Sequence, residues 1–359
     1  MSTHFHELKI IEIIKETAEC VSVCFSVPDD LKELFLYKEG QNLTIKKNIA
    51  GEEVRRSYSI CSAPYENKLK IAIKKVDNGL FSTFANEQLN INDTLEVMPP
   101  SGKFNAHLNA STSPSYLAIA AGSGITPVIS IIKHTLQHQQ DSQFTLIYGS
   151  KNRNSVIFFE ELENLKNKYI ERFTFINILS REKTDAEIFY GRIDENKLAA
   201  LNKLVHYNNF AEAYLCGPES MIFSAAAFLE KKGIEKNKIH FELFTTPGQQ
   251  NKTHSIKEET MVSTGPKSNV TIKLDGRIVS FDLSYNGNNI LDAALQEGAD
   301  LPYACKGGVC CTCRAKLVEG NVKMDVNYAL EPEELVQGFI LTCQSHPTTE
   351  KVFIDFDIK

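Results

Sequence analysis

The sequence has no apolar stretch approaching the roughly 20 residues that are needed to span a bilayer. Its first residues, Met1–Glu7, contain no basic patch followed by an apolar core, as an export signal requires. Positive charge is not in excess, because 39 Lys and Arg stand against 45 Asp and Glu, and this argues against general binding to nucleic acid or anionic membranes. These absences predict a cytoplasmic protein with no nucleic-acid or membrane partner.

Cysteine, by contrast, is present nine times. The cytosol keeps thiols reduced, so disulfides are a poor explanation for these residues in a chain with no export signal. Metal binding or redox chemistry is the better hypothesis.

The length of 359 residues favours two or three domains, and the sequence patterns favour three. Residues 1–110 contain short β-type segments such as Leu8–Ile14 and Cys20–Ser26, separated by turn residues, and predict a small antiparallel barrel. In residues 111–245, buried apolar runs such as Tyr116–Ala121 alternate with helical patterns, which predicts a parallel sheet covered by helices on both faces.

The C-terminal part differs in pattern and in charge. Residues 246–267 are rich in small and polar residues, lack an apolar period and predict a linker. Residues 268–359 contain a predicted hairpin around Asp275-Gly276, a short helix and a closing strand. In this segment 8 Lys and Arg stand against 13 Asp and Glu, so it holds most of the net negative charge of the chain.

The cysteine spacing in this segment is specific. The run Cys305-Lys-Gly-Gly-Val-Cys310-Cys311-Thr-Cys313, followed by Cys343, matches the C-x₄-C-x₂-C…C pattern of plant-type [2Fe–2S] ferredoxins. The small residues between the cysteines leave room for backbone close to a cluster. A structural zinc site is the alternative, but zinc sites prefer two paired hooks and Cys343 has no cysteine near it in sequence. The predicted metal ligands are Cys305, Cys310, Cys313 and Cys343.

The other cysteines fall outside this spacing. Cys311 lies within the loop but off the pattern, so we expect it not to be a ligand. Cys20, Cys24 and Cys61 are predicted to be small core residues of the barrel.

A nucleotide site is indicated where the predicted strand Tyr116–Ala121 leads into Gly122-Ser-Gly124-Ile-Thr126-Pro127 and a helix. Backbone N–H groups and a helix N-terminus there suit an anionic dinucleotide. The segment does not complete the G-x-G-x-x-G fingerprint, because Pro127 stands at the third glycine position. A plain strand-to-helix turn is therefore an open alternative.

A flavin site is indicated by Arg56-Ser-Tyr58-Ser59 in the β-rich region. An arginine there can bind phosphate and a tyrosine can cover a flat ring. Taken alone, this tetrapeptide would more often be an ordinary strand.

The order of these motifs, with Cys216-Gly217-Pro218 between the nucleotide and cysteine motifs, resembles the ferredoxin–NADP reductase superfamily in its oxygenase-reductase form, over nearly the whole chain. Within it, residues 56–62 and Gly79-Leu-Phe-Ser82 are similar to the reductase components of phenylacetyl-CoA epoxidases. The resemblance implies a multi-domain β, α/β and α+β protein. Its parts would be an FAD-binding antiparallel β-barrel, a parallel-sheet NAD(P)-binding domain and a C-terminal β-grasp ferredoxin domain.

The resemblance also implies roles for individual residues. The flavin ring would lie against Tyr58 with Ser59 near its N5 edge, and the nicotinamide would lie by Thr126 and Cys216, with Glu242 and Phe244 on the flavin's other side. The implied catalytic residues are Ser59, Cys216 and Glu242. The implied cofactor-binding residues are Arg56, Tyr58, Ser59, Lys74, Gly79, Phe81, Ser82, Gly122, Gly124, Thr126, Ser180, Arg181, Cys216, Gly217 and Phe244.

Cofactor choice depends on Ser180-Arg181, which ends the third strand of the nucleotide domain. In this superfamily a Ser-Arg pair at that place binds the 2′-phosphate of NADP, and a fixed guanidinium suits a dianion. We therefore expect NADPH rather than NADH, the alternative being that Arg181 is an ordinary surface arginine.

The implied electron flow runs from NADPH through FAD to the cluster and then to an oxygenase, with phenylacetyl-CoA or other aromatic degradation as the leading pathway. The acidic C-terminal domain would dock a basic patch of the acceptor. The same domains could serve another client, such as a desaturase or an aromatic hydroxylase. They could also belong to a redox sensor or scaffold without turnover.

Overall fold

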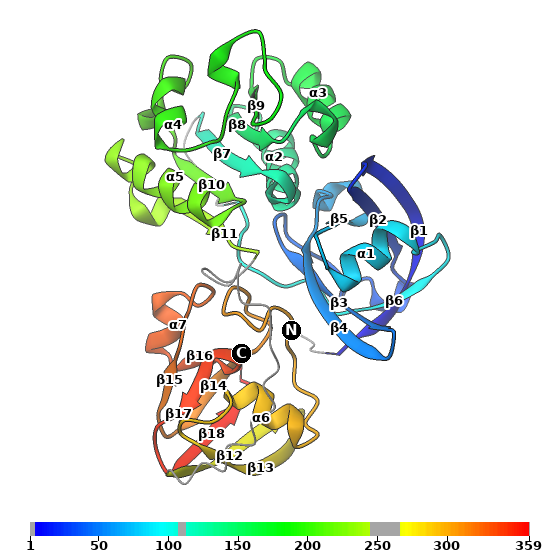
Figure 1. The fold of residues 1–359 in the computed structure, drawn as a ribbon, viewed down its shortest axis with the longest axis vertical. Coiled ribbons are helices and arrows are strands. Elements are labelled where there is room, and N and C mark those ends of the chain that lie inside the picture. The colour runs from blue at the N-terminus through cyan, green and yellow to red at the C-terminus, as the bar shows by residue number, and fades with distance from the viewer. Residues whose placement is uncertain (1–3, 107–112, 245–265, 359) are drawn as a thin grey trace. The chain divides into compact units, whose positions relative to one another are not determined.

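The computed structural model describes residues 4–106, 113–244 and 266–358, which divide into two compact units, His4–Phe244 and the described part of the chain after it (Figure 1). The first unit contains the barrel and the parallel sheet. The predicted linker, residues 246–267, lies almost entirely outside the described residues.

The N-terminal part of the first unit is a six-stranded antiparallel sheet in the order β4-β3-β6-β1-β2-β5. A further antiparallel bridge between Ile60 and Ile71 brings β4 and β5 together, so the sheet closes into a barrel. The strands are β1 (His6–Thr17), β2 (Cys20–Ser26), β3 (Asn42–Ile49), β4 (Glu52–Ser59), β5 (Leu69–Lys74) and β6 (Thr94–Val97).

A short helix, α1 (Leu80–Glu87), lies between β5 and β6 and begins directly after Gly79. The sequence patterns did not predict it. It buries Phe81, Ser82 and Ala85, too few positions to give a clear helical period.

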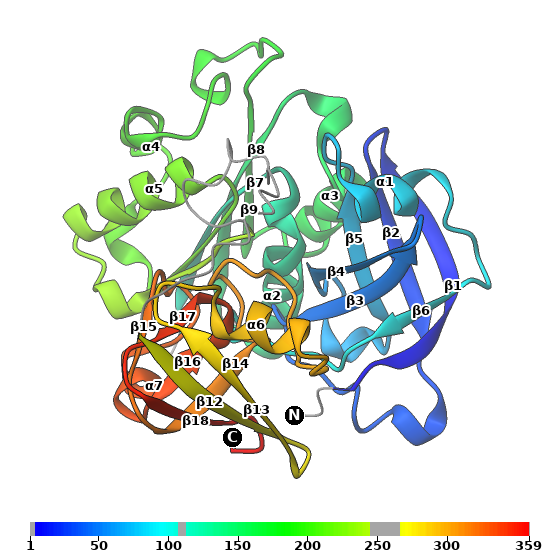
Figure 2. The ribbon, with the colours of Figure 1, turned by 60° about the horizontal axis from the view of Figure 1, so that its bottom comes forward.

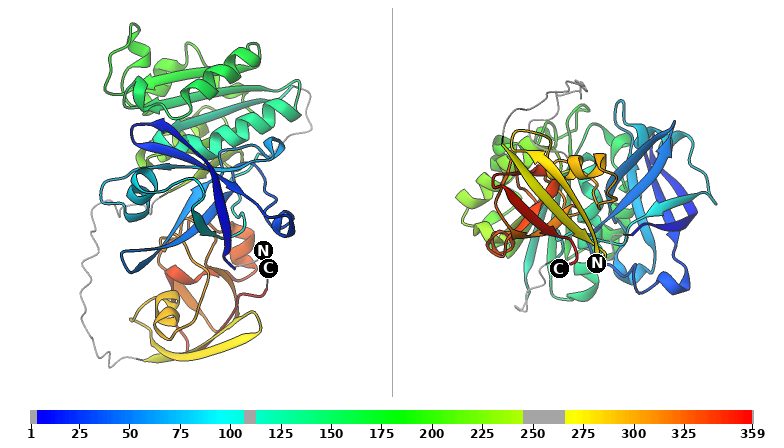
Figure 3. Two further views of the ribbon diagram at one scale, coloured as in Figure 1. Left: turned by 90° about the vertical axis from the view of Figure 1, so that its right-hand side faces the viewer. Right: turned by 90° about the horizontal axis from the view of Figure 1, so that it is seen from below.

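The second part of this unit is a five-stranded parallel sheet with helices on both faces (Figure 3). Its order is β11-β10-β7-β8-β9, so the direction of strand addition reverses between β7 and β10, where ligands bind in open α/β sheets. The strands are β7 (Ser115–Ala121), β8 (Gln143–Ser150), β9 (Phe173–Leu179), β10 (Glu212–Cys216) and β11 (Ile239–Glu242). The helices are α2 (Ile125–His138), α3 (Phe159–Lys168), α4 (Glu195–Leu201) and α5 (Glu219–Lys231).

One apolar cluster connects the barrel to this sheet. Cys20, Cys61 and Ala72 of the barrel are buried in the same cluster as residues of β7, α2 and α3. Cys20 and Cys61 are therefore core residues, but of the junction between the two parts rather than of the barrel interior. The barrel has a cluster of its own that includes Leu8, Ile10 and other residues of its strands.

The C-terminal unit is a mixed sheet in the order β13-β12-β18-β14-β16 with helix α6 packed on it (Figure 2). The predicted hairpin around Asp275-Gly276 is confirmed as β12 paired with β13. Helix α7 was not predicted. The elements are β12 (Lys267–Leu274), β13 (Arg277–Ser284), α6 (Ile290–Gln296), β14 (Arg314–Glu319), β15 (Val322–Met324), α7 (Pro332–Val336), β16 (Phe339–Leu341), β17 (Ser345–Pro347) and β18 (Lys351–Asp355).

The predicted fold class of barrel, parallel sheet and ferredoxin-like domain is thus confirmed. In residues 4–106, 113–244 and 266–358, no helix is long and apolar enough to cross a bilayer.

Candidate functional site

The three predicted catalytic residues lie together at the carboxyl edge of the parallel sheet. Ser59 ends β4, and its hydroxyl donates a hydrogen bond of 3.1 Å to Oε2 of Glu242, which ends β11. Glu242 stands opposite Cys216 in the β10–β11 register, and Cys216 stands opposite Ala120 of β7. Residues far apart in sequence therefore meet where the barrel faces the strand ends.

Burial controls the protonation of this group. Desolvation raises the pKa of Glu242 to about 7, although hydrogen bonds from Ser59 and Asn42 act in the other direction. Burial, reinforced by the charge of Glu242, also holds the pKa of the Cys216 thiol well above its usual value. Asn42 was not predicted as a site residue; it stands opposite Ser59 in the β3–β4 register, which a sequence motif does not reveal.

The predicted flavin-binding residues lie on β4 and at the start of α1. Arg56 is exposed, and its guanidinium donates to the carbonyl of Arg55 at 2.7 Å. The ring of Tyr58 lies 5.6 Å from that of Phe81. An exposed guanidinium, a helix start and an aromatic ring on one wall fit the phosphates and flat ring of FAD.

The nucleotide loop approaches β10 closely. A Cβ on Gly124 would lie 2.1 Å from the carbonyl oxygen of Cys216, so a side chain has no room there. Gly122 and Gly217 have positive φ angles of 56° and 153°. Thr126 is buried at the start of α2, with its hydroxyl donating to the carbonyl of Ser123 at 3.0 Å.

A cavity of about 440 Å³ opens above this edge of the sheet. Lys74, Lys151 and Arg192 line it, and none of the described lining residues is acidic, so the cavity is cationic and fits an anionic nucleotide. Burial lowers the pKa of Lys74, and nearby Lys151 adds to the effect. The lining residues are Lys74, Ala121, Gly122, Ser123, Gly149, Ser150, Lys151, Ser155, Ser180, Gly191, Arg192, Ile193, Gly217, Pro218, Ser220, Met221 and Phe244.

The cavity contains only part of the predicted 2′-phosphate site. Ser180 lines it, whereas Arg181 is exposed and is not among the lining residues. Lys151 and Arg192 were missed by the sequence analysis. Lys151 directly follows β8, so its place at the carboxyl edge could have been anticipated; Arg192 lies in a loop without a comparable pattern.

The cysteines of the C-terminal unit are grouped around one loop. Cys305 and Cys310 have their sulfur atoms 3.1 Å apart, and Cys343 interacts with Cys305 and Cys313. Contacts with the Cys310 and Cys343 thiols, together with the backbone N–H groups of Gly307 and Val309, lower the pKa of Cys305 far below its usual value. These contacts thus favour the thiolate form at Cys305, whereas the same contacts raise the pKa values of Cys310 and Cys343.

This donor set fits a two-iron cluster. In the part of the chain that the structure describes, no three or more His, Cys, Asp or Glu side chains are arranged to hold a single metal ion. A [2Fe–2S] cluster does not require four ligands around one point, unlike tetrahedral zinc. Cys311 points elsewhere, since its thiol donates to the carbonyl of Ala329 at 3.1 Å.

Family models match all three parts of the chain. The oxidoreductase FAD-binding domain matches residues 7–106, the oxidoreductase NAD-binding domain residues 118–227, and the 2Fe-2S iron-sulfur cluster binding domain residues 272–348. These matches support binding of FAD, a pyridine nucleotide and a [2Fe–2S] cluster.

Curated relatives and a solved structure cover almost the whole chain. It is 44% identical to one of the subunits of 1,2-phenylacetyl-CoA epoxidase from Escherichia coli K12, over 99% of both chains. It is 33% identical to the ferredoxin reductase component of 3-ketosteroid-9-alpha-monooxygenase of Rhodococcus rhodochrous, over 97% of this chain and 96% of the relative. The fold is similar to phthalate dioxygenase reductase, with a TM-score of 0.57, 21% identity and 98% coverage of each chain.

Proposed function

Because this chain belongs to the ferredoxin–NADP reductase superfamily, in the oxygenase-reductase form with FAD-binding, NAD-binding and [2Fe–2S] domains, we propose that it passes electrons from NADPH to an oxygenase of aromatic catabolism. It is an NAD(P)H:acceptor oxidoreductase. The proposed client is a phenylacetyl-CoA epoxidase, and the observation that carries this choice is the 44% identity to the Escherichia coli epoxidase protein over 99% of both chains.

When bound, FAD would supply the link between two-electron hydride transfer from the nicotinamide and one-electron transfer to the cluster. The protein's task is to orient these groups. Arg56 would bind the pyrophosphate, Tyr58 would cover the flavin ring, and Gly79 to Ser82 would contribute the start of α1. Gly122, Gly124 and Gly217 would let backbone approach the nucleotide.

Glu242 would hold a proton beside the reacting groups. Its pKa of about 7 makes the carboxyl largely neutral below that pH, and the hydroxyl of Ser59 links it to the flavin side. A neutral carboxyl avoids repulsion of the negative charge that hydride brings onto the flavin. Cys216 would remain a protonated thiol and pack against the nicotinamide.

The preference for NADPH rests on the cationic cavity. Ser180 lies in it together with Lys151 and Arg192, and Arg181 follows Ser180 directly. Each of the three cationic side chains would strengthen the binding of a dianionic 2′-phosphate, whereas it would add little to the binding of a ribose hydroxyl.

The test is to compare Arg181→Ala with Arg192→Ala in kcat/KM for both nucleotides. If the guanidinium binds the 2′-phosphate, its removal should lower kcat/KM roughly tenfold to 100-fold with NADPH and should leave kcat/KM with NADH almost unchanged. If efficiencies with both nucleotides fall together, or stay unchanged in both variants, the 2′-phosphate assignment is wrong. Arg153→Ala, an exposed residue outside the cavity lining, serves as the control.

The cofactor content is tested on the purified protein. We expect about one FAD and about two iron atoms per chain, with flavin and iron–sulfur absorbance bleached by NADPH. About one zinc and no iron would contradict the cluster assignment. Reduction of cytochrome c or ferricyanide by NADPH excludes a sensor or scaffold without turnover.

The client is tested by reconstitution. The reduced protein is mixed with the oxygenase component of a phenylacetyl-CoA epoxidase, of an aromatic hydroxylase or of a desaturase, and coupled product is measured. Product formation with the epoxidase component, and with neither of the other two components, supports the proposal. Product only with another component assigns a different client to the same chemistry.

The acceptor would dock on the C-terminal unit beside the cluster loop. Glu331, just before α7, and Glu333 on α7 are exposed, and Val336 at the end of α7 is 88% exposed. The segment leading into α7 lies on the cluster loop, since the carbonyl of Ala329 accepts from Cys311. An acidic rim around an apolar side chain suits an acceptor with a basic patch around an apolar centre.

Docking is tested through the salt dependence of electron delivery. The rate of oxygenase reduction should fall as ionic strength rises, and Glu331→Gln with Glu333→Gln should flatten this dependence. Asp282→Asn is the control, because β13 lies at the opposite edge of the sheet from β16, against which α7 packs. A rate that is flat in salt for the unmodified protein would contradict acidic docking.

A further inference from the structure

Helix α2 connects the nucleotide loop to the barrel. It carries Thr126 in its first turn, and one turn later the hydroxyl of Ser130 donates a buried hydrogen bond of 2.6 Å to the carbonyl of Ser62 in the barrel. Ser62 lies three residues after Ser59 in sequence. This hydrogen bond therefore connects the predicted nucleotide-binding segment to the predicted flavin-binding segment. On each side, only a few residues separate the bond from a predicted cofactor-binding residue.

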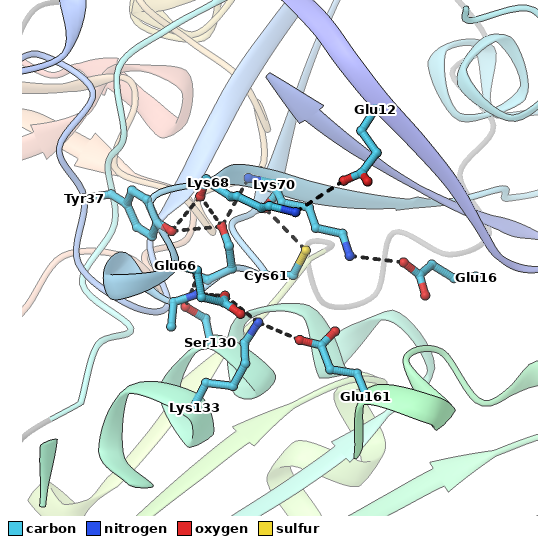
Figure 4. Close-up of polar contacts among 12 residues, drawn as sticks. Glu12, Glu16, Tyr37, Cys61, Glu66, Lys68, Lys70, Ser130, Lys133 and Glu161 are labelled. Atoms are coloured by element: carbon cyan, nitrogen blue, oxygen red, sulfur yellow. Dashed lines mark hydrogen bonds and ion pairs between the residues drawn. The ribbon is translucent and has the colours of Figure 1, made fainter. Parts of the chain in front are cut away.

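Lys133 lies one turn further along α2, at the centre of the same junction (Figure 4). Its side chain is 5% exposed, and its ammonium contacts Oε2 of Glu66 at 2.7 Å and Oε1 of Glu161 at 2.8 Å. Glu66 belongs to the barrel, whereas Glu161 belongs to α3 of the nucleotide-binding part. One buried cation is thus shared between one carboxylate from each part.

The barrel side of this contact is fixed in place. Oε2 of Glu66 also accepts a hydrogen bond from the backbone N–H of Ala63 at 2.5 Å, which holds the short 3₁₀ turn Pro64–Glu66. Cys61, just before this turn, is buried in the apolar cluster shared with α2 and α3. The ammonium therefore binds a rigid partner rather than a mobile side chain.

A buried ammonium is disfavoured by desolvation, and here the two carboxylates more than offset that effect, so the pKa of Lys133 is raised. Without the ammonium, two carboxylates from different parts of the protein would face each other. The charge arrangement thus favours one relative placement of the barrel and the parallel sheet.

We infer that Lys133 is a positioning residue for hydride transfer: its shared contact with Glu66 and Glu161 fixes the nucleotide-binding part against the barrel so that the nicotinamide meets the flavin. The inference rests on the proposed binding of FAD and NADPH on the two sides of this junction. Misplacement by about 1 Å can cost on the order of 100-fold in rate, so the contact matters more for rate than for affinity.

The chain offers a matched pair of variants. Glu66→Gln and Glu161→Gln each leave Lys133 with one carboxylate, and the side chains are similarly exposed, at 28% and 32%. Glutamine at position 66 can still accept the hydrogen bond from Ala63. Only Glu66→Gln removes charge across the junction, whereas Glu161→Gln removes it within the nucleotide-binding part.

The full-length protein is measured by stopped-flow flavin reduction with NADPH, by the charge-transfer absorbance of the nicotinamide–flavin pair and by thermal unfolding. We expect Glu66→Gln to lower the hydride-transfer rate about tenfold or more and to weaken the charge-transfer band, with a smaller change in KM. Glu161→Gln should keep a hydride-transfer rate within about twofold of the unmodified protein, although its unfolding temperature should fall about as much as that of Glu66→Gln. Equal rate losses in both variants, or no loss in either, would overturn the inference.

A second readout does not depend on turnover. Amide hydrogen exchange of the protein without cofactors should accelerate in Pro64–Glu66 and on α2 in Glu66→Gln, but not in Glu161→Gln. If NADPH reduces no flavin in the unmodified protein, the proposed function fails, while this exchange contrast still reports on the junction. Lys133→Arg should keep most of the rate that Lys133→Met loses, because a guanidinium can still reach both carboxylates; equal losses in the two variants would contradict a charge-based role.

Discussion

The cluster site and the flavin–nicotinamide site are assembled in opposite ways. Three of the four cluster cysteines lie in one loop, Cys305 to Cys313, and only Cys343 is distant in sequence. The other site joins Ser59 to Glu242, which are 183 residues apart, and places Cys216 beside them. The first site depends on local loop conformation, and the second depends on how two parts of one unit fit together.

This difference teaches where each site is vulnerable. The cluster loop requires a left-handed backbone at Lys306 and Gly308, with φ angles of 50° and 73°, and close packing of Gly308 against Val326. The flavin–nicotinamide site requires a buried junction. A lesion in one site should therefore spare the other, which the following predictions test.

The largest effect is expected for Cys343→Ala, which removes a buried cysteine that we propose as a cluster ligand. Iron should be lost and reduction of cytochrome c should fall to the background rate, because three thiolates do not complete the site. Flavin content and NADPH–ferricyanide activity should persist, because the other unit is intact. Iron analysis and the two assays check this.

The control for this change is Cys311→Ala in the same loop. Its thiol donates to the Ala329 carbonyl and it lies outside the C-x₄-C-x₂-C spacing, so iron content and cytochrome c reduction should be retained. Loss of iron in Cys311→Ala would show that the spacing assigns the ligands wrongly.

Gly124→Ala should damage the other site and leave the cluster unchanged. The added Cβ would lie 2.1 Å from the Cys216 carbonyl oxygen, so the nucleotide loop must move away from β10. A displacement of this kind should reduce kcat/KM for NADPH by about 100-fold. Ser123→Ala at the neighbouring position introduces no clash and should retain most activity; equal losses in the two variants would contradict the packing argument.

Glu242→Gln should change the pH dependence of flavin reduction. With a pKa of about 7, the protonated fraction of Glu242 falls about tenfold between about pH 6 and about pH 8, and the rate of hydride transfer should fall with it. Glutamine is neutral throughout, so the variant should show a flat profile over this range. A profile that keeps its inflection in the variant would assign the proton to another group.

The same carboxyl affects stability. Between about pH 4.5 and about pH 7 the folded protein keeps a proton on Glu242 that the unfolded chain has lost, so the group makes folding less favourable as pH rises through this window. Glu242→Gln should remove this contribution to the pH dependence of the folded protein's stability. Thermal unfolding of the protein without cofactors across this range measures it.

The smallest effect is expected for Lys306→Ala beside the cluster. Its ion pair with Asp292 has a length of 2.7 Å, but the two side chains are 41% and 38% exposed, so its loss should change the free energy of unfolding by less than about 1 kcal/mol. Lys133→Met, which removes a buried cation, should cost about 3 to 5 kcal/mol. Chemical denaturation of both variants compares the exposed and the buried ion pairs directly.

Much of the fold could be predicted because its periods are strong. The apolar run Tyr116–Ala121 was recognisable from sequence alone, and it lies within β7 of the parallel sheet. Helices α1 and α7 were missed, because eight and five residues bury too few side chains to show a helical period.

The two sites also differed in how far their residues could be predicted from the sequence. The grouping of Cys305, Cys310, Cys313 and Cys343 could be predicted from spacing, because a tight loop brings three of the side chains together. Asn42 and Arg192 could not, because their places depend on strand register and on a loop returning to the sheet edge, whereas Lys151 could have been anticipated because it directly follows β8. The role of Lys133 was hidden for a similar reason, since its two carboxylates come from different parts of the chain.

The shared apolar cluster has a consequence for recombination between relatives. Phe104 and Tyr116, on the two sides of the connection between barrel and sheet, are buried in one cluster together with Cys20 and Cys61. A hybrid that takes its barrel from one relative and its sheet from another must match both halves of this interior at once. Residues 266–358 form a compact unit by their own contacts. Viable crossovers should therefore fall after Phe244. The barrel and the parallel sheet would then be inherited together, and the C-terminal unit would be exchanged to suit a new client.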